Sequence, residues 1–150
     1  MDLSDALLCE SKTARTQGLT QIKSQHSEEQ ILNKVKALFF AVWNDVGRLS
    51  REQLATFYDV PLATIDSNYK NHKDEFEIDG VKPFKGKDLK QLKGILPLSP
   101  NSPEEVIYTP AGALRMGFIL RDSPVAKTVR TAAIRFIQGV GSSLPNEVLL

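Results

Sequence analysis

The sequence predicts an α+β fold that is mainly helical: a helix-turn-helix, a small wing-like β-hairpin, then C-terminal helices. Three observations predict it. A periodic apolar stripe follows residue 27, two short helical segments flank a turn after residue 50, and apolar and polar residues alternate around an Asp-Gly pair at 79–80. The 150 residues suffice for one ordinary domain with tails. We expect a mobile N-terminal arm at 1–26, with a short helical piece at Leu3–Leu8, a domain at 27–138 and a C-terminal tail at 139–150.

The first long helix is expected from about Glu28 to Val46. Ser27 and Gln30 have the spacing of a capping box, and apolar residues then recur at three- and four-residue steps. This apolar face is broader than one side of a small core normally absorbs, so we expect a homodimer with this helix at its seam. The alternative is that the C-terminal helices cover the face within one chain. The expected dimer interface is Leu32, Val35, Phe39, Val42, Trp43 and Val46.

Two short helices follow, and together they have the pattern of a helix-turn-helix. Ser50 and Gln53 form a second capping box ahead of a helix to about Tyr58, and Pro61 suits the first position of the next helix. Asp59 stands in the turn, where glycine is usual, and aspartate tolerates the left-handed region better than most residues. The side chains expected to pack between the two helices are Leu54, Ala55, Val60 and Ile65.

The helix after this turn is the expected reader of double-stranded DNA. Its outward residues are small or able to form hydrogen bonds, which suits base edges and phosphates. They are Ala63, Thr64, Ser67, Asn68, Lys70 and Asn71.

Basic residues gather in two later windows, each with a net charge of +4, at Val81–Lys93 and Gly112–Gln138. We expect them to contact phosphates, with a solvated lysine-rich surface as the alternative. The Asp-Gly pair predicts a hairpin over Glu75–Phe84, with Pro83 on an edge strand. The expected DNA contacts from the windows are Lys82, Lys85, Lys87, Arg121, Lys127 and Arg130.

The remaining elements are read from caps and prolines. We expect helical turns at Asp88–Leu92, a loop at Leu96–Glu105 and a strand at Val106–Tyr108. A helix capped by Thr109 should follow and end near Leu120. A last helix, capped by Ser123, should run through Ile137 with an apolar face of Val125, Val129, Ala133, Phe136 and Ile137.

The C-terminal half resembles a known family. Val106-Ile107-Tyr108-Thr109-Pro110-Ala111-Gly112-Ala113-Leu114, then Ile119-Leu120-Arg121-Asp122-Ser123-Pro124-Val125-Ala126, then Ile134-Arg135-Phe136-Ile137 are similar to the BRO N-terminal domain and its KilA-N and Rha-like relatives, the phage and viral antirepressors. The likeness covers about residues 50–138 and departs at Asp122. The family's aromatic-rich opening is not evident. The resemblance implies a regulator that binds DNA or opposes a repressor.

These observations predict a sequence-specific, DNA-binding transcriptional regulator that is not an enzyme. The alternative is an antirepressor-like module that binds a repressor protein and not DNA. No metal site, cofactor fingerprint or catalytic constellation is evident, and the one cysteine permits no intrachain disulfide. No apolar run reaches the roughly 18 residues of a membrane helix. We therefore expect a cytoplasmic, nucleoid-associated protein.

Overall fold

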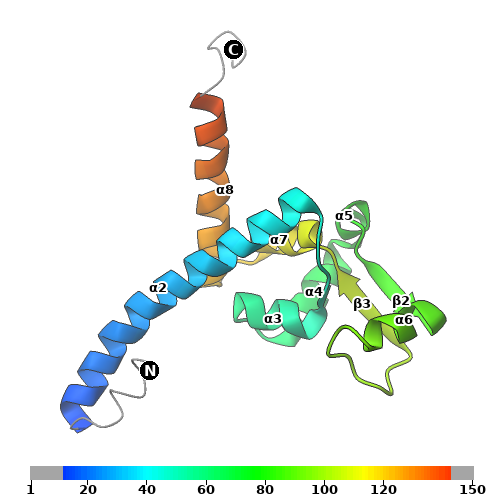
Figure 1. The fold of residues 1–150 in the computed structure, drawn as a ribbon, viewed down its shortest axis with the longest axis horizontal. Helices are drawn as coiled ribbons and strands as arrows, with labels where there is room; N and C mark the ends of the chain where they lie inside the picture. The colour runs from blue at the N-terminus through cyan, green and yellow to red at the C-terminus, as the bar shows by residue number, and fades with distance from the viewer. Residues whose placement is uncertain (1–11, 143–150) are drawn as a thin grey trace. The chain divides into compact units, whose positions relative to one another are not determined.

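The computed structural model describes residues 12–142 and the side chains of residues 28–139. It divides into two compact units, residues 1–34 and residues 35–150. The elements in chain order are α2 (Lys12–Asn44), β1 (Leu49–Ser50), α3 (Arg51–Tyr58), α4 (Leu62–Asn71), α5 (Lys73–Ile78), β2 (Lys82–Lys85), α6 (Gly86–Lys93), β3 (Glu104–Tyr108), α7 (Pro110–Ile119) and α8 (Pro124–Ser142) (Figure 1). The predicted mainly helical α+β class is confirmed.

The described part of the first unit is the beginning of α2. The helix begins at Lys12, so the prediction of a start at Ser27 was wrong, as was a non-helical reading of residues 12–26. Lysine, arginine, glutamine and alanine in this stretch are good helix formers even without an apolar stripe. The helical piece expected at Leu3–Leu8 lies outside the described residues.

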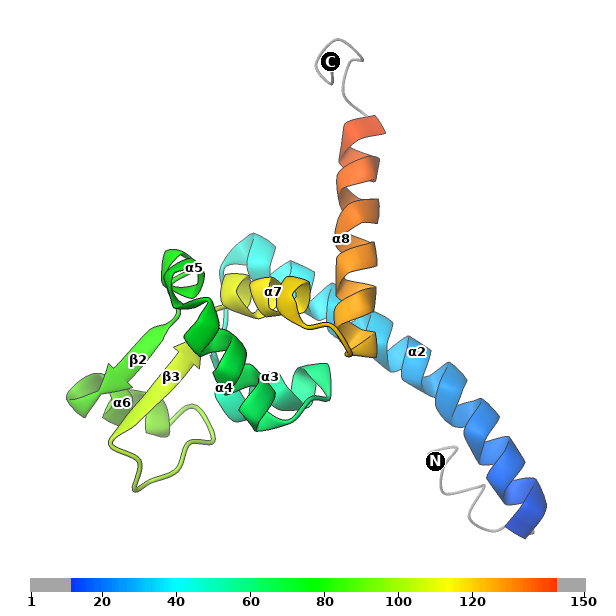
Figure 2. The same ribbon diagram turned by 180° about the vertical axis from the view of Figure 1, so that it is seen from behind.

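A three-stranded antiparallel sheet, in the order β1-β3-β2, forms one part of the second unit, and Figure 2 shows β2 beside β3. Leu49 pairs with Tyr108 across β1 and β3, and Lys82 pairs with Ile107 across β2 and β3. Pro83 is confirmed on an edge strand, because β2 pairs with β3 alone among the described strands. This placement is the one a proline tolerates, since it cannot donate to a ladder.

The predicted hairpin over Glu75–Phe84 was wrong. Its first half is the helix α5, and its second half is β2, whose partner is the distant strand β3. Gly80, at φ +85°, ends α5: the N–H of Gly80 donates to the Glu77 carbonyl (3.0 Å) and that of Val81 to the Phe76 carbonyl (3.0 Å). This is a Schellman motif, in which a left-handed glycine closes a helix. The Asp-Gly pair therefore terminates a helix here and does not join two strands.

The core of the second unit lies where α3, α4, α7 and α8 meet β3. Tyr58 is fully buried there, and its hydroxyl donates to the Ala113 carbonyl of α7. Ser123, also buried, donates through its Oγ to the Tyr58 carbonyl (2.7 Å) and accepts from the Ala126 N–H (3.1 Å). The predicted Ser123 cap is thus confirmed, and it joins α8 to α3 as well.

The other predicted caps and elements are largely confirmed. The Thr109 side chain caps α7, and β3 and α6 include the residues expected of them. The last helix runs past Ile137 to Ser142, so residues 139–142 of the expected tail are helical. On its apolar face Val125 and Val129 are buried, whereas Phe136 and Ile137 are exposed.

The expected dimer seam along α2 is only partly accessible. Val35 is buried within the chain, so its assignment to an interface between copies was wrong. Phe39 and Val42 are half-buried, and Val46 lies beyond the end of the helix. Helical periodicity marks which residues share a face but not which part of that face the chain's own core covers.

Candidate nucleic-acid interface

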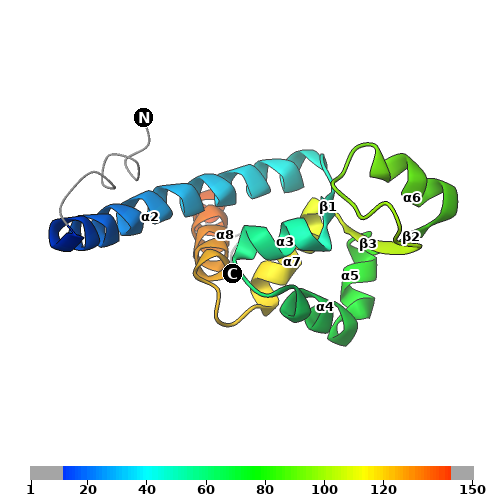
Figure 3. The ribbon, with the colours of Figure 1, turned by 90° about the horizontal axis from the view of Figure 1, so that it is seen from below.

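A short turn at residues 59–61 joins α3 to α4 (Figure 3). Asp59 adopts the left-handed conformation, at φ +54° and ψ +52°. Its N–H donates to the Thr56 carbonyl (3.2 Å), and the Val60 N–H donates to the Ala55 carbonyl (3.0 Å). Aspartate therefore fills the position that glycine usually occupies, as the sequence predicted.

The two helices are held against each other by apolar and ionic contacts. Leu54 and Ile65 are fully buried and Ala55 nearly so, as predicted, whereas Val60 is half-buried and lines a hollow beside the turn. Arg51 of α3 binds Asp66 of α4, with 2.6 Å between the Nη1 and Oδ2 atoms. These contacts fix α4 relative to α3, so the outer face of α4 is presented in one orientation.

Arg51 also reaches the sheet, because its Nε lies 3.7 Å from the carboxylate of buried Glu105 on β3. No motif in the sequence marks this arginine or its partners as functional residues. Only the i,i+15 and i,i+54 spacings link them, and neither spacing belongs to a local motif.

The inner face of α4 is fixed by aromatic contacts. The Tyr69 ring lies 5.8 Å from the Phe76 ring and 6.1 Å from the Tyr108 ring, centroid to centroid. Burial, followed by the charges of Glu77 and Glu104, raises the pKa of Tyr69. Its buried hydroxyl has no hydrogen-bond partner among the described residues.

The outer face of α4 presents most of the residues predicted to read DNA. Ala63, Ser67, Lys70 and Asn71 are exposed. Thr64 and Asn68 are half-buried and line a hollow described next. Lys70 makes no ion pair within the described part of the chain.

A hollow of about 400 Å³ lies between the α3–α4 turn and the α7–α8 turn. Asn68 stands on one side of it, where its Nδ2 lies 3.9 Å from the Met116 Sδ. Arg121 stands on the other side and is exposed. The structure thus brings Arg121 of the second basic window beside the predicted reader helix, although 53 positions separate it from Asn68 in the sequence.

The cations predicted to contact phosphates differ in whether their side chains already have partners within the described part of the chain. The side chains of Lys87, Arg121 and Lys127 are exposed and make no hydrogen bond or ion pair to another described residue. Lys85 lies 3.8 Å from Glu104, and the Lys82 ammonium sits 5.3 Å from the Phe84 ring centre. Both are weak, exposed contacts that a phosphate can replace.

Arg130 differs from these cations. It is half-buried, and its Nη1 donates to the carbonyls of Gly117 (2.8 Å) and Leu120 (2.6 Å) at the end of α7. Arg130 forms no ion pair with the nearby Asp122 or with any other carboxylate of the described residues. This arginine joins α8 to α7 and satisfies carbonyls that the helix itself leaves open.

Arg115, in the same basic window, is likewise engaged. It binds Asp79 through two nitrogens and Glu75 at 3.0 Å, and the Asp79 hydrogen bond raises the pKa of the Arg115 guanidinium. These two carboxylates neutralise it, so it adds little to the positive surface.

No protein-family model, curated protein or solved structure matches the chain. Among the side chains of residues 28–139, no group of three histidine, cysteine, aspartate or glutamate residues is placed to hold a metal ion. None of the helices within residues 12–142 is both long and apolar enough to cross a membrane.

Proposed function

We propose that the protein is a sequence-specific transcriptional regulator that binds double-stranded DNA through α4. One observation carries the proposal. Ile65 is completely buried on one face of α4, while the opposite face offers exposed, uncharged hydrogen-bonding groups and, at its end, a lysine without an ion pair among the described residues. A short helix fixed on one side and polar on the other is what entry into a major groove requires.

The surrounding cations supply the sequence-independent part of this binding. Arg121 lies beside the hollow next to α4, and Lys127 is exposed on the following helix. Lys82 and Lys85 are exposed on the edge strand β2, which occupies the place of a wing although the predicted hairpin does not form. Phosphate contacts of this kind set orientation and affinity without reading sequence.

Within α4, we assign base reading to Asn68 together with Ser67 and Thr64. Among the described residues, the side-chain amide of Asn68 makes one hydrogen bond, to the thioether sulfur of Met116, which is a weak acceptor. It can release that contact and pair with an adenine edge, the geometry that asparagine favours.

The test begins with selection of bound duplexes from a random pool near physiological salt. We expect an enriched sequence. Asn68→Ala should then weaken binding to that sequence by about 1–3 kcal/mol and relax its preference at one position. The matched control is Asn101→Ala, an exposed asparagine in the loop before β3, which should change neither quantity.

Arg121→Gln is the contrasting variant. Removing a phosphate contact should weaken binding to all duplexes equally and reduce the salt slope by about 1. If no sequence is enriched and the slope does not change, α4 is not a DNA reader. That result would favour the alternative, a module that binds a repressor protein.

A further inference from the structure

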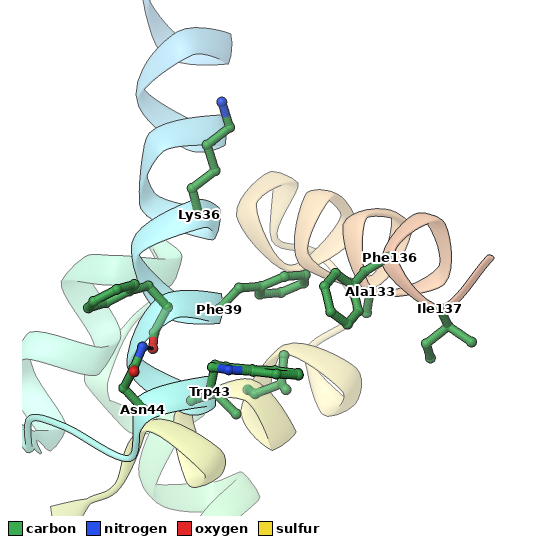
Figure 4. A pocket seen from close by; sticks show the side chains of 10 residues that line it. Lys36, Phe39, Trp43, Asn44, Ala133, Phe136 and Ile137 are labelled. Carbon is green, nitrogen blue, oxygen red and sulfur yellow. Dashed lines mark hydrogen bonds between the residues drawn. The ribbon is translucent and has the colours of Figure 1, made fainter. Parts of the chain in front are cut away.

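An apolar groove lies within the second unit, between the end of α2 and α8. Its volume is about 520 Å³. Figure 4 shows the Phe39 and Trp43 rings of α2 directed toward Phe136 of α8. Phe136 meets both rings edge-on, with centroids 6.3 Å from Phe39 and 6.1 Å from Trp43. These contacts build the groove wall but leave most of it open.

The apolar side chains around the groove are unusually exposed. Trp43 is 78% exposed, Phe40 66% and Ile137 68%. Phe136 is 49% exposed even though it touches two other rings. A soluble chain seldom leaves so many large apolar side chains together in water unless something covers them.

The area involved is that of half a protein interface. Taking roughly 150–250 Å² for a fully accessible aromatic side chain, Trp43, Phe40 and Phe136 leave about 400 Å² in water. Ile137 and the groove rim add to this. Two such faces in contact approach the roughly 1,200 Å² at which stable protein interfaces begin.

The groove offers almost nothing polar to a ligand. Its two polar lining residues are Lys36 and Asn44, and Asn44 already donates to the Phe40 carbonyl (2.8 Å). Interfaces between identical subunits are the most apolar class, whereas exchangeable partners and small ligands are held by placed polar groups. The lining therefore favours a second copy of the same chain.

The surface around the groove can also pack against an identical surface on a second copy of the chain. It carries a hollow and, beside it, the protruding side chains of Phe40 and Ile137. In a two-fold dimer each copy offers the same patch, so the projections of one chain can fill the hollow of the other. We propose that the α2–α8 groove is the interface of a two-fold homodimer. This interface replaces the single-helix seam expected from the sequence.

Trp43, the only tryptophan of the chain, is a direct reporter for this interface. Sedimentation equilibrium from 1 to 100 micromolar, without DNA, should show twice the 16.7 kDa chain mass at the upper end. Trp43 emission should move to shorter wavelength over the same range, because association removes the indole from water. Since no DNA is present, the result is independent of the proposed function.

Phe40→Glu and Ile137→Glu test the surface while keeping the reporter. Both residues are largely exposed in the single chain, so we expect the fold, checked by far-ultraviolet circular dichroism, to be retained. Each should raise the dimer dissociation constant roughly a hundredfold or more, because a two-fold interface contains each substitution twice. Ile95→Glu is the matched control: Ile95 is 79% exposed, lies outside the groove, and its change should leave the dimer intact.

Three outcomes would overturn the proposal. The first is a wild-type chain that stays at 16.7 kDa at 100 micromolar. The second is a dimer that survives both groove substitutions, which would place the interface elsewhere. The third is a monomer whose Trp43 emission responds to 8-anilinonaphthalene-1-sulfonate, which would assign the groove to a small apolar ligand.

Discussion

Gly117 lies where α7 passes closest to the buried Tyr58. A Cβ atom at this glycine would stand 2.6 Å from the Tyr58 hydroxyl oxygen and 2.9 Å from a methyl carbon of Val129. Neither neighbour is free to move, since Tyr58 and Val129 are fully buried. Glycine is therefore required by the close approach of α7 to α3 and α8.

Gly117→Ala should consequently lower the free energy of unfolding by about 1–3 kcal/mol, the usual cost of overpacking a core. Urea denaturation measures this change. Gly139→Ala is the matched control, because a Cβ at that position of α8 meets nothing within 4 Å. It should be neutral or stabilise the helix by up to about 1 kcal/mol. Equal stability of the two variants would contradict the packing described around Tyr58.

At the scale of elements, Ser50 connects a strand to a helix. It is fully buried, pairs with Ile107 as the last residue of β1, and caps α3. Its Oγ accepts from the Gln53 N–H (3.1 Å), while the Gln53 side chain accepts from the Ser50 N–H (2.9 Å). The capping box predicted from the sequence is confirmed in both directions.

Ser50→Ala removes one half of this box and should destabilise the chain by about 1–2 kcal/mol. Ser50→Thr retains an acceptor oxygen and should cost less, so the difference between the two variants reports the cap itself. Thermal unfolding followed by circular dichroism measures both. If alanine and threonine cost the same, the buried volume at Ser50 matters more than its hydrogen bond.

The elements that the sequence predicted well are those whose signals are local. Ser50, Thr109 and Ser123 each cap a helix through their own neighbours, and Asp59 adopts its left-handed turn through bonds to Ala55 and Thr56. Such signals need no knowledge of distant residues. The α3–α4 part of the candidate site was predictable for this reason.

The wrong hairpin and the missed groove share a cause, which is contact between elements that are separate in the sequence. An Asp-Gly pair suits a hairpin turn and a helix end equally, and here the burial of Phe76 against the Tyr69 and Tyr108 rings selects the helix. The apolar groove between α2 and α8 was not predicted for the same reason. Phe136 shares the periodicity of core residues, and only the arrangement of α2, α7 and α8 shows that the core ends before it.

At the scale of the whole molecule, two buried tyrosines make the fold sensitive to alkali. Burial raises the pKa values of Tyr58 and Tyr108 above the ordinary value. A group whose pKa is higher in the folded state stabilises the fold below its unfolded pKa, near 10 for tyrosine, and loses that contribution as pH rises further. The free energy of unfolding should therefore fall above about pH 10.

Tyr58→Phe checks this expectation. At neutral pH it should cost about 1–3 kcal/mol, because the Ala113 carbonyl loses its buried donor. Above pH 10 its stability should fall less steeply than that of the wild type, since one of the three tyrosines with a raised pKa is gone. Urea titrations between pH 7 and 11 measure both slopes, and parallel curves would show that Tyr58 does not contribute to alkaline unfolding.

The free edge of β2 has a consequence for keeping the protein monodisperse. An unpaired strand edge is a template on which another chain can add a strand and begin a fibril. Here Pro83 interrupts the donors of that edge, while Lys82 and Lys85 place like charges along it. The two lysines that we propose to face phosphates therefore also oppose aggregation through this edge. Replacing both lysines by neutral residues removes this charge repulsion. If such a variant precipitated, a binding assay would record the loss of protein as a loss of DNA binding.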